Sequence, residues 1–429
     1  MRQVFELLRT ESRARLFFLA LTQSAIGTGA GYVALVLIAY ERYESAWAIT
    51  FVLLADLLPA MLLGPVFGAA ADRWSRRGCM VVSDVLRAIA FIGISLVDSY
   101  LATVALALFA GVGTGIFTPA SLAALPSVTT AERAPAGTAL YGVTADIGFT
   151  LGPAVAALAL LFASAQDVTL VNGLTFAVSA LILLRLPFGA VTAGPELSAP
   201  GGLQLLREAR AGLGALAAVP GARAVIAGSS AALLFGGLFN VAELPFAKTE
   251  IGTDGAGFSL LVACFGLGFV GGSLSGSKGG DVQKLRRRFI FGLVLDGIGV
   301  MACAAAATVP VAAVAFALAG AGNGMFLVHE RVFLQQTVPE RFLARAYGAK
   351  DALASWGFGI AFVAAGGLLS IADPRTVFWL AGGGALLGAA LTGVVLHRAQ
   401  LKMDAQHAAR DREGLVRREA AGYVEAPTR

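Results

Sequence analysis

The dominant pattern along the chain is a series of long apolar runs, separated by short stretches that contain charges, prolines and glycines. A helix that spans a bilayer needs about 20 mainly apolar residues, whereas the strands of an outer-membrane barrel alternate with period two over about ten residues. Twelve runs approach or exceed the length of a spanning helix, and they lie near residues 16–40, 47–71, 80–97, 101–124, 137–163, 168–186, 223–247, 257–277, 288–308, 310–334, 345–370 and 375–397. The sequence therefore predicts an all-α integral membrane protein with twelve transmembrane helices.

Composition excludes a soluble enzyme. Of the 429 residues, 57% are hydrophobic and only 14% are charged, whereas an ordinary soluble domain has roughly 25% charged residues. The three cysteines, Cys79, Cys264 and Cys303, lie far apart, and none has a second cysteine or a histidine at metal-ligand spacing. His329 is followed by Glu330 but not by the second histidine of a zinc motif. We therefore expect no metal, no cofactor and no enzymatic activity.

The lysines and arginines are distributed unevenly between the two sides of the predicted membrane protein. Only Arg42, Lys248 and Arg375 fall on the side opposite the termini, and Arg87 lies within a run, while the others fall on the side of the termini. Cytoplasmic loops carry an excess of these residues. We therefore expect a multi-pass protein of the cell (inner or cytoplasmic) membrane with both termini in the cytoplasm. The net charge of +5 then reflects topology, and we expect no nucleic-acid partner.

An internal repeat relates the two halves of the chain. Residues Ala110–Phe117 read AGVGTGIF, and residues Ala319–Phe326, which lie 209 positions later, read AGAGNGMF. The same spacing relates Asp72 to Asp281. Parallel repeats of six spans, related by an axis along the membrane normal, rock against each other and expose a shared site to each side in turn. We therefore expect two pseudo-symmetric six-helix bundles.

The repeat and the loop lengths predict how the chain is divided. We expect an N-terminal six-helix bundle in residues 1–186, a cytoplasmic linker in 187–222, a C-terminal six-helix bundle in 223–397 and a charged cytoplasmic tail in 398–429. The linker begins with prolines and glycines and becomes amphipathic over Leu203–Leu216. That pattern is typical of a helix that lies on the membrane surface.

A motif between the second and third runs indicates a family. It contains two glycines, an aspartate and three arginines, which are Gly64, Gly68, Asp72, Arg73, Arg76 and Arg77. The stretch resembles the signature loop of the major facilitator superfamily, Gly-x-x-x-Asp-Arg-x-Gly-Arg-Arg, with Ser75 in place of the usual loop glycine, a change expected to weaken the turn. The resemblance implies that these residues form a conformational gate against the partner half, with Asp281 and Arg286 as repeat counterparts. The alternative is that the arginines only anchor the loop on the cytoplasmic side.

A second motif favours export over import. Gly148, Gly152 and Pro153 resemble the antiporter motif Gly-x-x-x-Gly-Pro of drug-exporting members of the superfamily. Finer features resemble the branch that contains macrolide-efflux and enterobactin-export proteins, including SDVLRA from Ser83 and the tripeptide that begins at Glu243. One departure matters. Many superfamily antiporters carry an arginine early in the fourth span, and residues 101–124 contain no charge.

Charged residues within the spans require a functional or structural explanation, since each costs about 2.5–3.5 kcal/mol at the bilayer centre on insertion scales. Asp56 and Asp146 each lie nine residues inside a run, roughly 13 Å deep at 1.5 Å per residue. We consider these two the main candidates for proton coupling and Glu243 a secondary one. The alternative is that each carboxylate is hydrogen-bonded to a neighbouring helix and never titrates.

Three further charged positions are not expected to take part in coupling. Asp84 and Arg87 lie three residues apart on one helical face and are expected to form a pair. Asp296, the repeat counterpart of Arg87, falls in the ninth span, which is peripheral in the fold that the resemblance implies.

In that fold the first, fourth, seventh and tenth spans line a central cavity. Their candidate contacts are mostly apolar or aromatic, and they are Gln23, Tyr32, Phe117, Phe235, Asn240, Asn323 and Phe326. Such a wall suits a bulky amphiphile better than a sugar, which would need many fixed hydrogen bonds. An ATP-driven pump is excluded, because Gly276–Lys278 lacks the pattern of a phosphate loop.

The sequence thus favours a secondary active transporter that exports a small hydrophobic or amphipathic compound, such as a drug, antibiotic or secondary metabolite. We expect proton antiport with alternating access by a monomer embedded in membrane lipid. Two alternatives stay open. The first is a uniporter or importer of the same fold, since the missing arginine of the fourth span leaves coupling undecided. The second is a membrane sensor or scaffold that does not transport.

Overall fold

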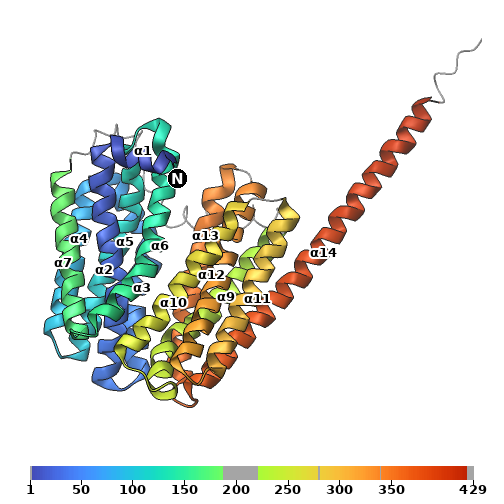
Figure 1. Ribbon diagram of the computed structural model, residues 1–429. Helices are drawn as coiled ribbons and strands as arrows, with labels where there is room; N and C mark the ends of the chain where they lie inside the picture. The colour runs from blue at the N-terminus through green and yellow to red at the C-terminus, as the bar shows by residue number, and fades with distance from the viewer. Residues whose placement is uncertain (1, 187–220, 279–280, 339, 423–429) are drawn as a thin grey trace, which may run out of the picture.

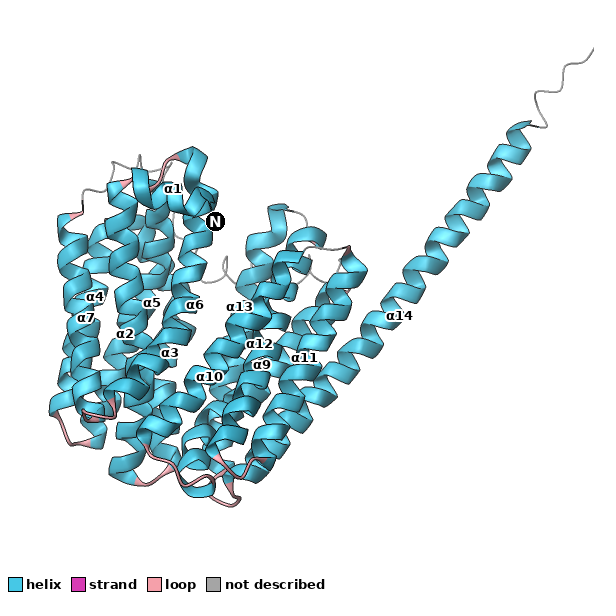
Figure 2. Ribbon diagram, viewed as in Figure 1, coloured by secondary structure: helices cyan, strands magenta, loops and turns pink. Residues whose placement is uncertain are grey.

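The protein is all helical in the part of the chain that the computed structural model describes, which is residues 2–186, 221–278, 281–338 and 340–422. Within these residues there is no strand, and the helices are joined by short loops (Figure 2). Twelve long helices coincide with the twelve predicted runs, which confirms the predicted fold class. A short helix, α1 (Arg2–Thr10), was not predicted and precedes the first span. The amphipathic segment predicted over residues 203–216 lies outside the described residues.

Six of the long helices form the N-half and six form the C-half (Figure 1). The N-half consists of α2 (Ser12–Tyr43), α3 (Ala46–Arg73), α4 (Arg76–Leu96), α5 (Tyr100–Val128), α6 (Ala134–Ala159) and α7 (Ala165–Arg185). The C-half consists of α9 (Ala222–Pro245), α10 (Gly255–Ser273), α11 (Val282–Ala305), α12 (Val309–Thr337), α13 (Glu340–Leu368) and α14 (Pro374–Gly422). The described residues also contain three single turns: η1 (Ala131–Arg133), η2 (Phe246–Glu250) and η3 (Leu274–Lys278).

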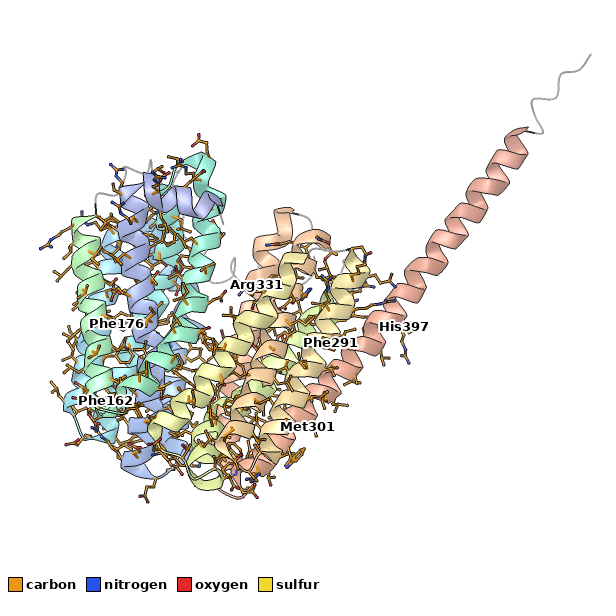
Figure 3. All side chains as sticks on the ribbon, in the orientation of Figure 1. Phe162, Phe176, Phe291, Met301, Arg331 and His397 are labelled. Carbon is orange, nitrogen blue, oxygen red and sulfur yellow. The ribbon has the colours of Figure 1, made fainter. Side chains whose placement is uncertain are left out.

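Length and composition make these helices membrane spans. Eleven of them are long and apolar enough to cross a bilayer, and α13 contributes a shorter apolar stretch, Leu353–Leu368. Large apolar side chains such as Phe162 and Phe291 project from the outer surface, with 90% and 56% of their area exposed (Figure 3). In water such a surface would be unfavourable, but lipid tails solvate it. Helix α14 continues well beyond the bundle (Figure 1).

Short polar side chains define where the helices begin. The Ser164 and Asp167 side chains form a capping box at the start of α7, and the Asp254 side chain accepts the Gly257 N–H at 2.8 Å at the start of α10. Asp373 accepts the Thr376 N–H at 2.7 Å, and this bond holds the pKa of the Asp373 carboxyl below its usual value. These caps satisfy amide groups that the helices leave free at their ends.

Ser75, which stands where the family loop has a glycine, also caps a helix. Its backbone is ordinary for any residue, with φ −63° and ψ 124°, and its hydroxyl accepts the Gly78 N–H at 3.1 Å at the start of α4. The expectation that this substitution weakens the turn is therefore wrong, because no left-handed backbone is needed here and a serine cap is favourable.

The repeated glycines explain the packing inside each half. Helix α5 packs against α3 and α4, and α12 packs in the same way against α10 and α11. A Cβ atom on Gly111 would clash with the backbone carbonyl of Asp56, and one on Gly320 would clash with that of Phe265. Both pairs are related by the spacing of 209 residues found in the sequence. The predicted pseudo-symmetry therefore extends to individual backbone contacts.

The two halves meet at one end of the molecule and diverge toward the end that carries the N-terminus (Figure 1). The contacts run between α3 and α13, between α6 and α10, and between α2 and α9. The Thr50 hydroxyl donates to the Phe362 carbonyl at 3.1 Å, and the Thr150 hydroxyl donates to the Gly266 carbonyl at 3.2 Å. We call the end where the halves meet, which holds the α2–α3 loop and the α9–α10 connection, the closed end.

Candidate transport cavity

A cavity of about 730 Å³ lies between the two halves. Five of the predicted contacts line it, and they are Tyr32, Phe117, Phe235, Asn240 and Asn323. The other two predicted contacts lie elsewhere. The Gln23 amide donates to the Thr175 carbonyl on α7 at 2.9 Å, and Phe326 is fully buried against Phe289 of α11. Gln23 and Phe326 therefore contribute to packing within one half. The sequence predicted which helices line the cavity but not which side of each helix faces it.

Aromatic rings dominate the wall and connect the halves. Phe149 of α6 contacts Phe265 and Phe269 of α10, with ring centroids 6.1 and 5.4 Å apart. Phe239 of α9 stacks on Phe265 at 5.9 Å. Edge-to-face and offset-stacked pairs of this kind are favourable without fixing a single geometry as hydrogen bonds do. The cavity can therefore accommodate apolar bodies of different shapes.

Four charged residues line the cavity in the described part of the chain: Arg87, Asp146, Glu243 and Asp296. Two of the three predicted coupling residues are among them. The third, Asp56 on α3, does not line the cavity but lies within electrostatic reach of Arg87.

Glu243 joins the two halves. It lies on α9 and is only 4% exposed, and its Oε1 accepts a hydrogen bond of 3.1 Å from the Tyr32 hydroxyl on α2. Asp146 lies on α6 and is partly exposed, within electrostatic reach of Arg331 on α12. In the part of the chain that the structure describes, Glu243 forms a hydrogen bond to the other half and Asp146 does not.

Arg87 is more than the structural partner that the sequence predicted. The expected pair with Asp84 forms, and both side chains are buried. The guanidinium also lies 4.2 Å from the ring centroid of Phe117 and 4.2 Å from that of Phe176. Phe117 belongs to α5, the span that lacks the usual arginine, so a cation from α4 lies against α5 instead.

Asp296 corrects a second expectation. The sequence placed it in a peripheral span, yet it is 5% exposed, lines the cavity and lies close to the Asn323 amide. The sequence did not mark this position as cavity-facing, because the repeat relates it only to Arg87, whose own place on the cavity wall is known from the structure.

The antiporter motif packs α6 closely against α2. A Cβ atom on Gly148 would lie 2.7 Å from the Ala25 carbonyl oxygen, and one on Gly152 would lie 2.5 Å from the Gly29 Cα. The adjacent Pro153 lines the cavity. The motif therefore brings two cavity helices into backbone contact, as small-residue faces do in membranes.

The predicted gate residues lie at the end opposite the closed end. Helix α3 ends at Arg73, and the surroundings of Gly64 and Gly68 and the side chains of Asp72 and Arg73 are outside the described part of the chain. Arg76 and Arg77 form the first turn of α4 and are half-buried.

The repeat counterparts of the gate residues occupy the start of α11. Asp281 caps this helix by accepting the Lys284 N–H at 2.8 Å. Arg286 is buried, with its guanidinium 5.8 Å from the Phe333 ring centroid. Since Asp72 falls in the last turn of α3 and Asp281 caps the following helix, the two loops differ although the sequence motif repeats.

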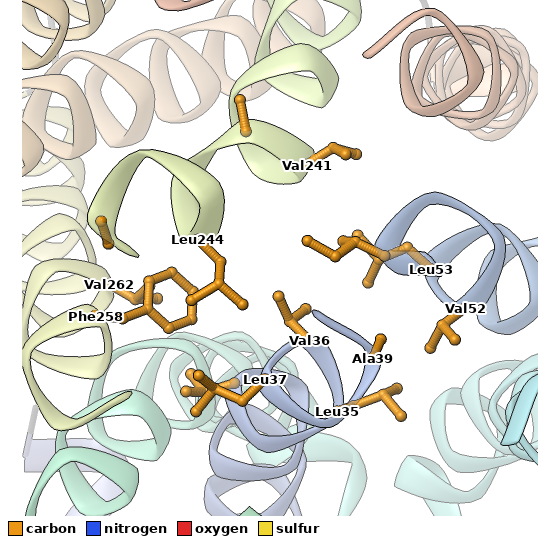
Figure 4. Close-up of a cluster of buried hydrophobic side chains, with 14 of the residues drawn as sticks. Leu35, Val36, Leu37, Ala39, Val52, Leu53, Val241, Leu244, Phe258 and Val262 are labelled. Atoms are coloured by element: carbon orange, nitrogen blue, oxygen red, sulfur yellow. The ribbon is translucent and has the colours of Figure 1, made fainter. Parts of the chain in front are cut away.

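The closed end is sealed by apolar packing and one ion pair. Val36 and Leu37 of α2 lie near Leu244 of α9 and Phe258 of α10 in one buried cluster (Figure 4). Nearer the loops, the Lys248 ammonium lies 2.7 Å from the Glu41 carboxylate, and both side chains are partly exposed. These contacts separate the cavity from this end of the molecule.

Comparison with known proteins identifies the family. The family model of the Major Facilitator Superfamily matches residues 16–240 and again residues 224–424. The chain belongs to the major facilitator superfamily. The family and the apolar helices together make it a multi-pass membrane protein.

Two relatives of this chain are named as an exporter and an efflux pump. A putative bacilysin exporter, BacE of Bacillus amyloliquefaciens, is 28% identical over 252 residues, which cover 58% of this chain and 62% of that protein. The multidrug efflux pump Tap of Mycobacterium tuberculosis is 27% identical over 201 residues, covering 44% and 48%. The matches thus span about three fifths and about half of these relatives.

Solved structures agree on the fold. The crystal structure of the nucleoside transporter NupG aligns with a TM-score of 0.69 at 14% identity, covering 90% of this chain and 99% of that one.

Proposed function

We propose that this transporter exports small hydrophobic or amphipathic compounds, such as drugs, antibiotics or secondary metabolites, in exchange for protons. Its place is then the cell membrane, with both termini in the cytoplasm. The two relatives named as a putative bacilysin exporter and a multidrug efflux pump support the direction. The lysine and arginine bias of the loops supports the orientation.

The observation that carries the proposal is the position of Glu243. This buried carboxylate faces the cavity and accepts a hydrogen bond from the other half. An ionised carboxylate accepts such a bond more strongly than a neutral carboxyl does. Loss or gain of a proton at Glu243 therefore changes the bond between α2 and α9. This links proton binding to the separation of the halves, as exchange requires.

The two other carboxylates, Asp146 and Asp56, have further roles in the proposed proton exchange. Asp146 faces the same cavity from α6, so it can exchange protons with the same solvent. Asp56 is in electrostatic contact with Arg87 and acts on the cavity through that residue. In this proposal Glu243 and Asp146 carry the protons, and Asp56 adjusts the charge balance of the N-half wall.

The closed end faces away from the cytoplasm in the proposed orientation. Substrate then enters the cavity from the side of the termini, where the halves diverge (Figure 1). In the opposite state the cytoplasmic end closes, and we assign that closure to the gate, which consists of Gly64, Gly68, Asp72, Arg73, Arg76 and Arg77, with Asp281 and Arg286 on the other half. The linker of residues 187–222 tethers two bundles that move as a monomer.

The proposal is tested by flux of an uncharged fluorescent amphipathic dye into proteoliposomes that contain the purified transporter. The parent should accumulate dye when a pH gradient is imposed and stop when an ionophore removes the gradient. Glu243→Gln should abolish this accumulation but keep dye exchange without a gradient, and Glu44→Gln, at an exposed position, should behave as the parent. Dye that reaches the same concentration on both sides at the same rate with and without the pH gradient, and is never concentrated, would identify a uniporter and overturn the coupling proposal.

A further inference from the structure

The repeated glycines also decide which side chains reach the cavity. Helices α4 and α11 pack against α5 and α12, and the middle glycine of each repeat lies at that contact. A Cβ atom on Gly113 would lie 2.7 Å from the Arg87 Cγ, and one on Gly322 would clash with the backbone of Asp296. Only glycine leaves room there, so Arg87 and Asp296 both reach the cavity wall past it.

These equivalent positions carry opposite charges with different surroundings. Arg87 is neutralised by Asp84, one turn earlier on its own helix. The repeat counterpart of Asp84 is Leu293, so Asp296 has no matching opposite charge one turn earlier. The polar group close to it is the neutral amide of Asn323.

The same contrast holds for the other charged residues of the wall. Asp146 lies within electrostatic reach of Arg331, whereas Glu243 is bonded to the neutral hydroxyl of Tyr32. The C-half wall therefore holds two carboxylates whose partners, in the part of the chain that the structure describes, are neutral. Buried charges in a membrane are costly unless a counter-ion accompanies them.

The two carboxylates share one region of the wall, which is rich in aromatic rings. Both line the same cavity from the C-half, and both lie within electrostatic reach of Cys303 on α11. The rings of Phe239 and Phe265 line the same cavity. Aromatic faces attract cations, and the attraction is larger where water is excluded.

We propose that Glu243 and Asp296 are the counter-ions for an organic cation, so that the preferred substrates are amphipathic monocations. The cationic group lies at the C-half wall, and the apolar body lies against the rings of α6, α9 and α10. This inference rests on the proposed export function and names its substrate class.

The test compares two probes of nearly the same shape and opposite permanent charge, tetraphenylphosphonium and tetraphenylborate. Equilibrium dialysis against the purified full-length transporter in detergent should show saturable binding of the phosphonium and none of the borate. Neither probe carries a titratable proton, so the result does not depend on proton coupling. Equal binding of both probes, or of neither, would overturn the cation site.

Variants then locate the site. Asp296→Asn and Glu243→Gln should each weaken phosphonium binding on the order of thirtyfold, because each removes one partner of a buried charge pair. Asp296→Glu should retain most of the binding, which separates loss of charge from loss of fold, and Asp98→Asn, whose side chain is 97% exposed, should match the parent. Unchanged binding in Asp296→Asn would remove Asp296 from the site.

The two proposals can fail separately. Flux of a neutral dye driven by a pH gradient, together with no phosphonium binding, would overturn the cation site and leave the export function in place. Phosphonium binding that depends on Asp296, with no flux of any dye, would overturn export and leave a cation-binding site.

Discussion

Arg87 serves both the packing of the N-half and the wall of the cavity. Its guanidinium is held by Asp84 and by two aromatic rings, and both members of the pair are buried. Arg87→Ala should destabilise the protein by about 3–5 kcal/mol, because it leaves the Asp84 carboxylate buried without its counter-ion. Denaturant unfolding in detergent, followed by tryptophan fluorescence, measures this loss.

A double variant separates the lost charge from the lost packing. Asp84→Asn combined with Arg87→Met removes both charges and should recover most of the stability. The exposed pair Lys284–Asp281, with side chains 66% and 63% exposed, provides the comparison. Breaking it with Lys284→Ala should cost no more than about 1 kcal/mol. Equal losses at the buried and exposed pairs would contradict this account.

Single residues are also where the sequence was least informative. The cavity positions of Tyr32, Asn240 and Asn323 could be predicted because the same helices line the cavity throughout the family fold. Gln23 and Asp296 could not, because one polar residue in an apolar helix does not reveal which neighbour it faces. The glycine that leaves room for Asp296 at the cavity wall, Gly322, lies on a different helix, α12.

At the scale of helices, the antiporter motif is a packing surface with a testable cost. Gly152→Ala would bring a Cβ atom within 2.5 Å of the α2 backbone at Gly29, which cannot move without shifting the helix. The variant should lower both thermal stability and flux. Gly142→Ala on the same helix is the matched control, since nothing lies within 4 Å of its Cβ position.

The outcome at Gly142 has a definite sign. Alanine is favoured over glycine within a helix by about 0.8–1.0 kcal/mol, so Gly142→Ala should leave the melting temperature unchanged or raise it. A similar loss in both variants would show that α6 needs glycine for its own conformation and not for contact with α2.

The start of α4 offers a second test. Ser75→Ala removes the hydroxyl that accepts the Gly78 N–H and should cost about 0.5–2 kcal/mol. Ser75→Gly, which restores the glycine of the family loop, should cost only a few tenths of a kcal/mol. Thermal unfolding of the two variants side by side measures the difference. A larger loss in the glycine variant would contradict the assignment of Ser75 as a cap.

The existence of the helices was predictable, but their orientation about their own axes was not. Long apolar runs bounded by Ser, Asp and Pro mark the spans reliably, and the structure has a helix at each of them. Helix α5 is apolar on nearly every side, so Leu101, which is 77% exposed, and Phe117, which is 9% exposed, belong to the same pattern. In lipid the outward face is as apolar as the inward face, and periodicity no longer distinguishes them.

At the scale of the whole molecule, the internal repeat predicted the two pseudo-symmetric bundles. The contacts of α3 with α13 and of α6 with α10 are consistent with that symmetry. The sequence did not predict the state in which the halves meet. The repeat is the same whichever end is closed, and the choice depends on small energy differences between two arrangements of one interface.

The Glu41–Lys248 pair allows that balance to be tested. It joins the halves at the closed end with 2.7 Å between nitrogen and oxygen, and it is partly exposed. An exposed pair contributes about 0.2–1 kcal/mol, and replacing it with two like charges adds repulsion. Since about 1.4 kcal/mol changes an equilibrium tenfold, Glu41→Lys or Lys248→Glu alone should shift the molecule measurably toward opening at this end.

The exchanged pair, Glu41→Lys with Lys248→Glu, should return the balance to that of the parent, because it restores attraction with the same groups. Spin labels on the α2–α3 loop and on the α9–α10 connection report the distance between the halves. Each single variant should increase the longer-distance population, and the exchange should reverse the increase. High salt should reduce the difference between each single variant and the parent, since exposed charges are screened within about 8–10 Å at 0.1–0.15 M ionic strength. Single variants with the distances of the parent would show that the apolar cluster around Leu37 and Leu244 seals this end without help from the ion pair.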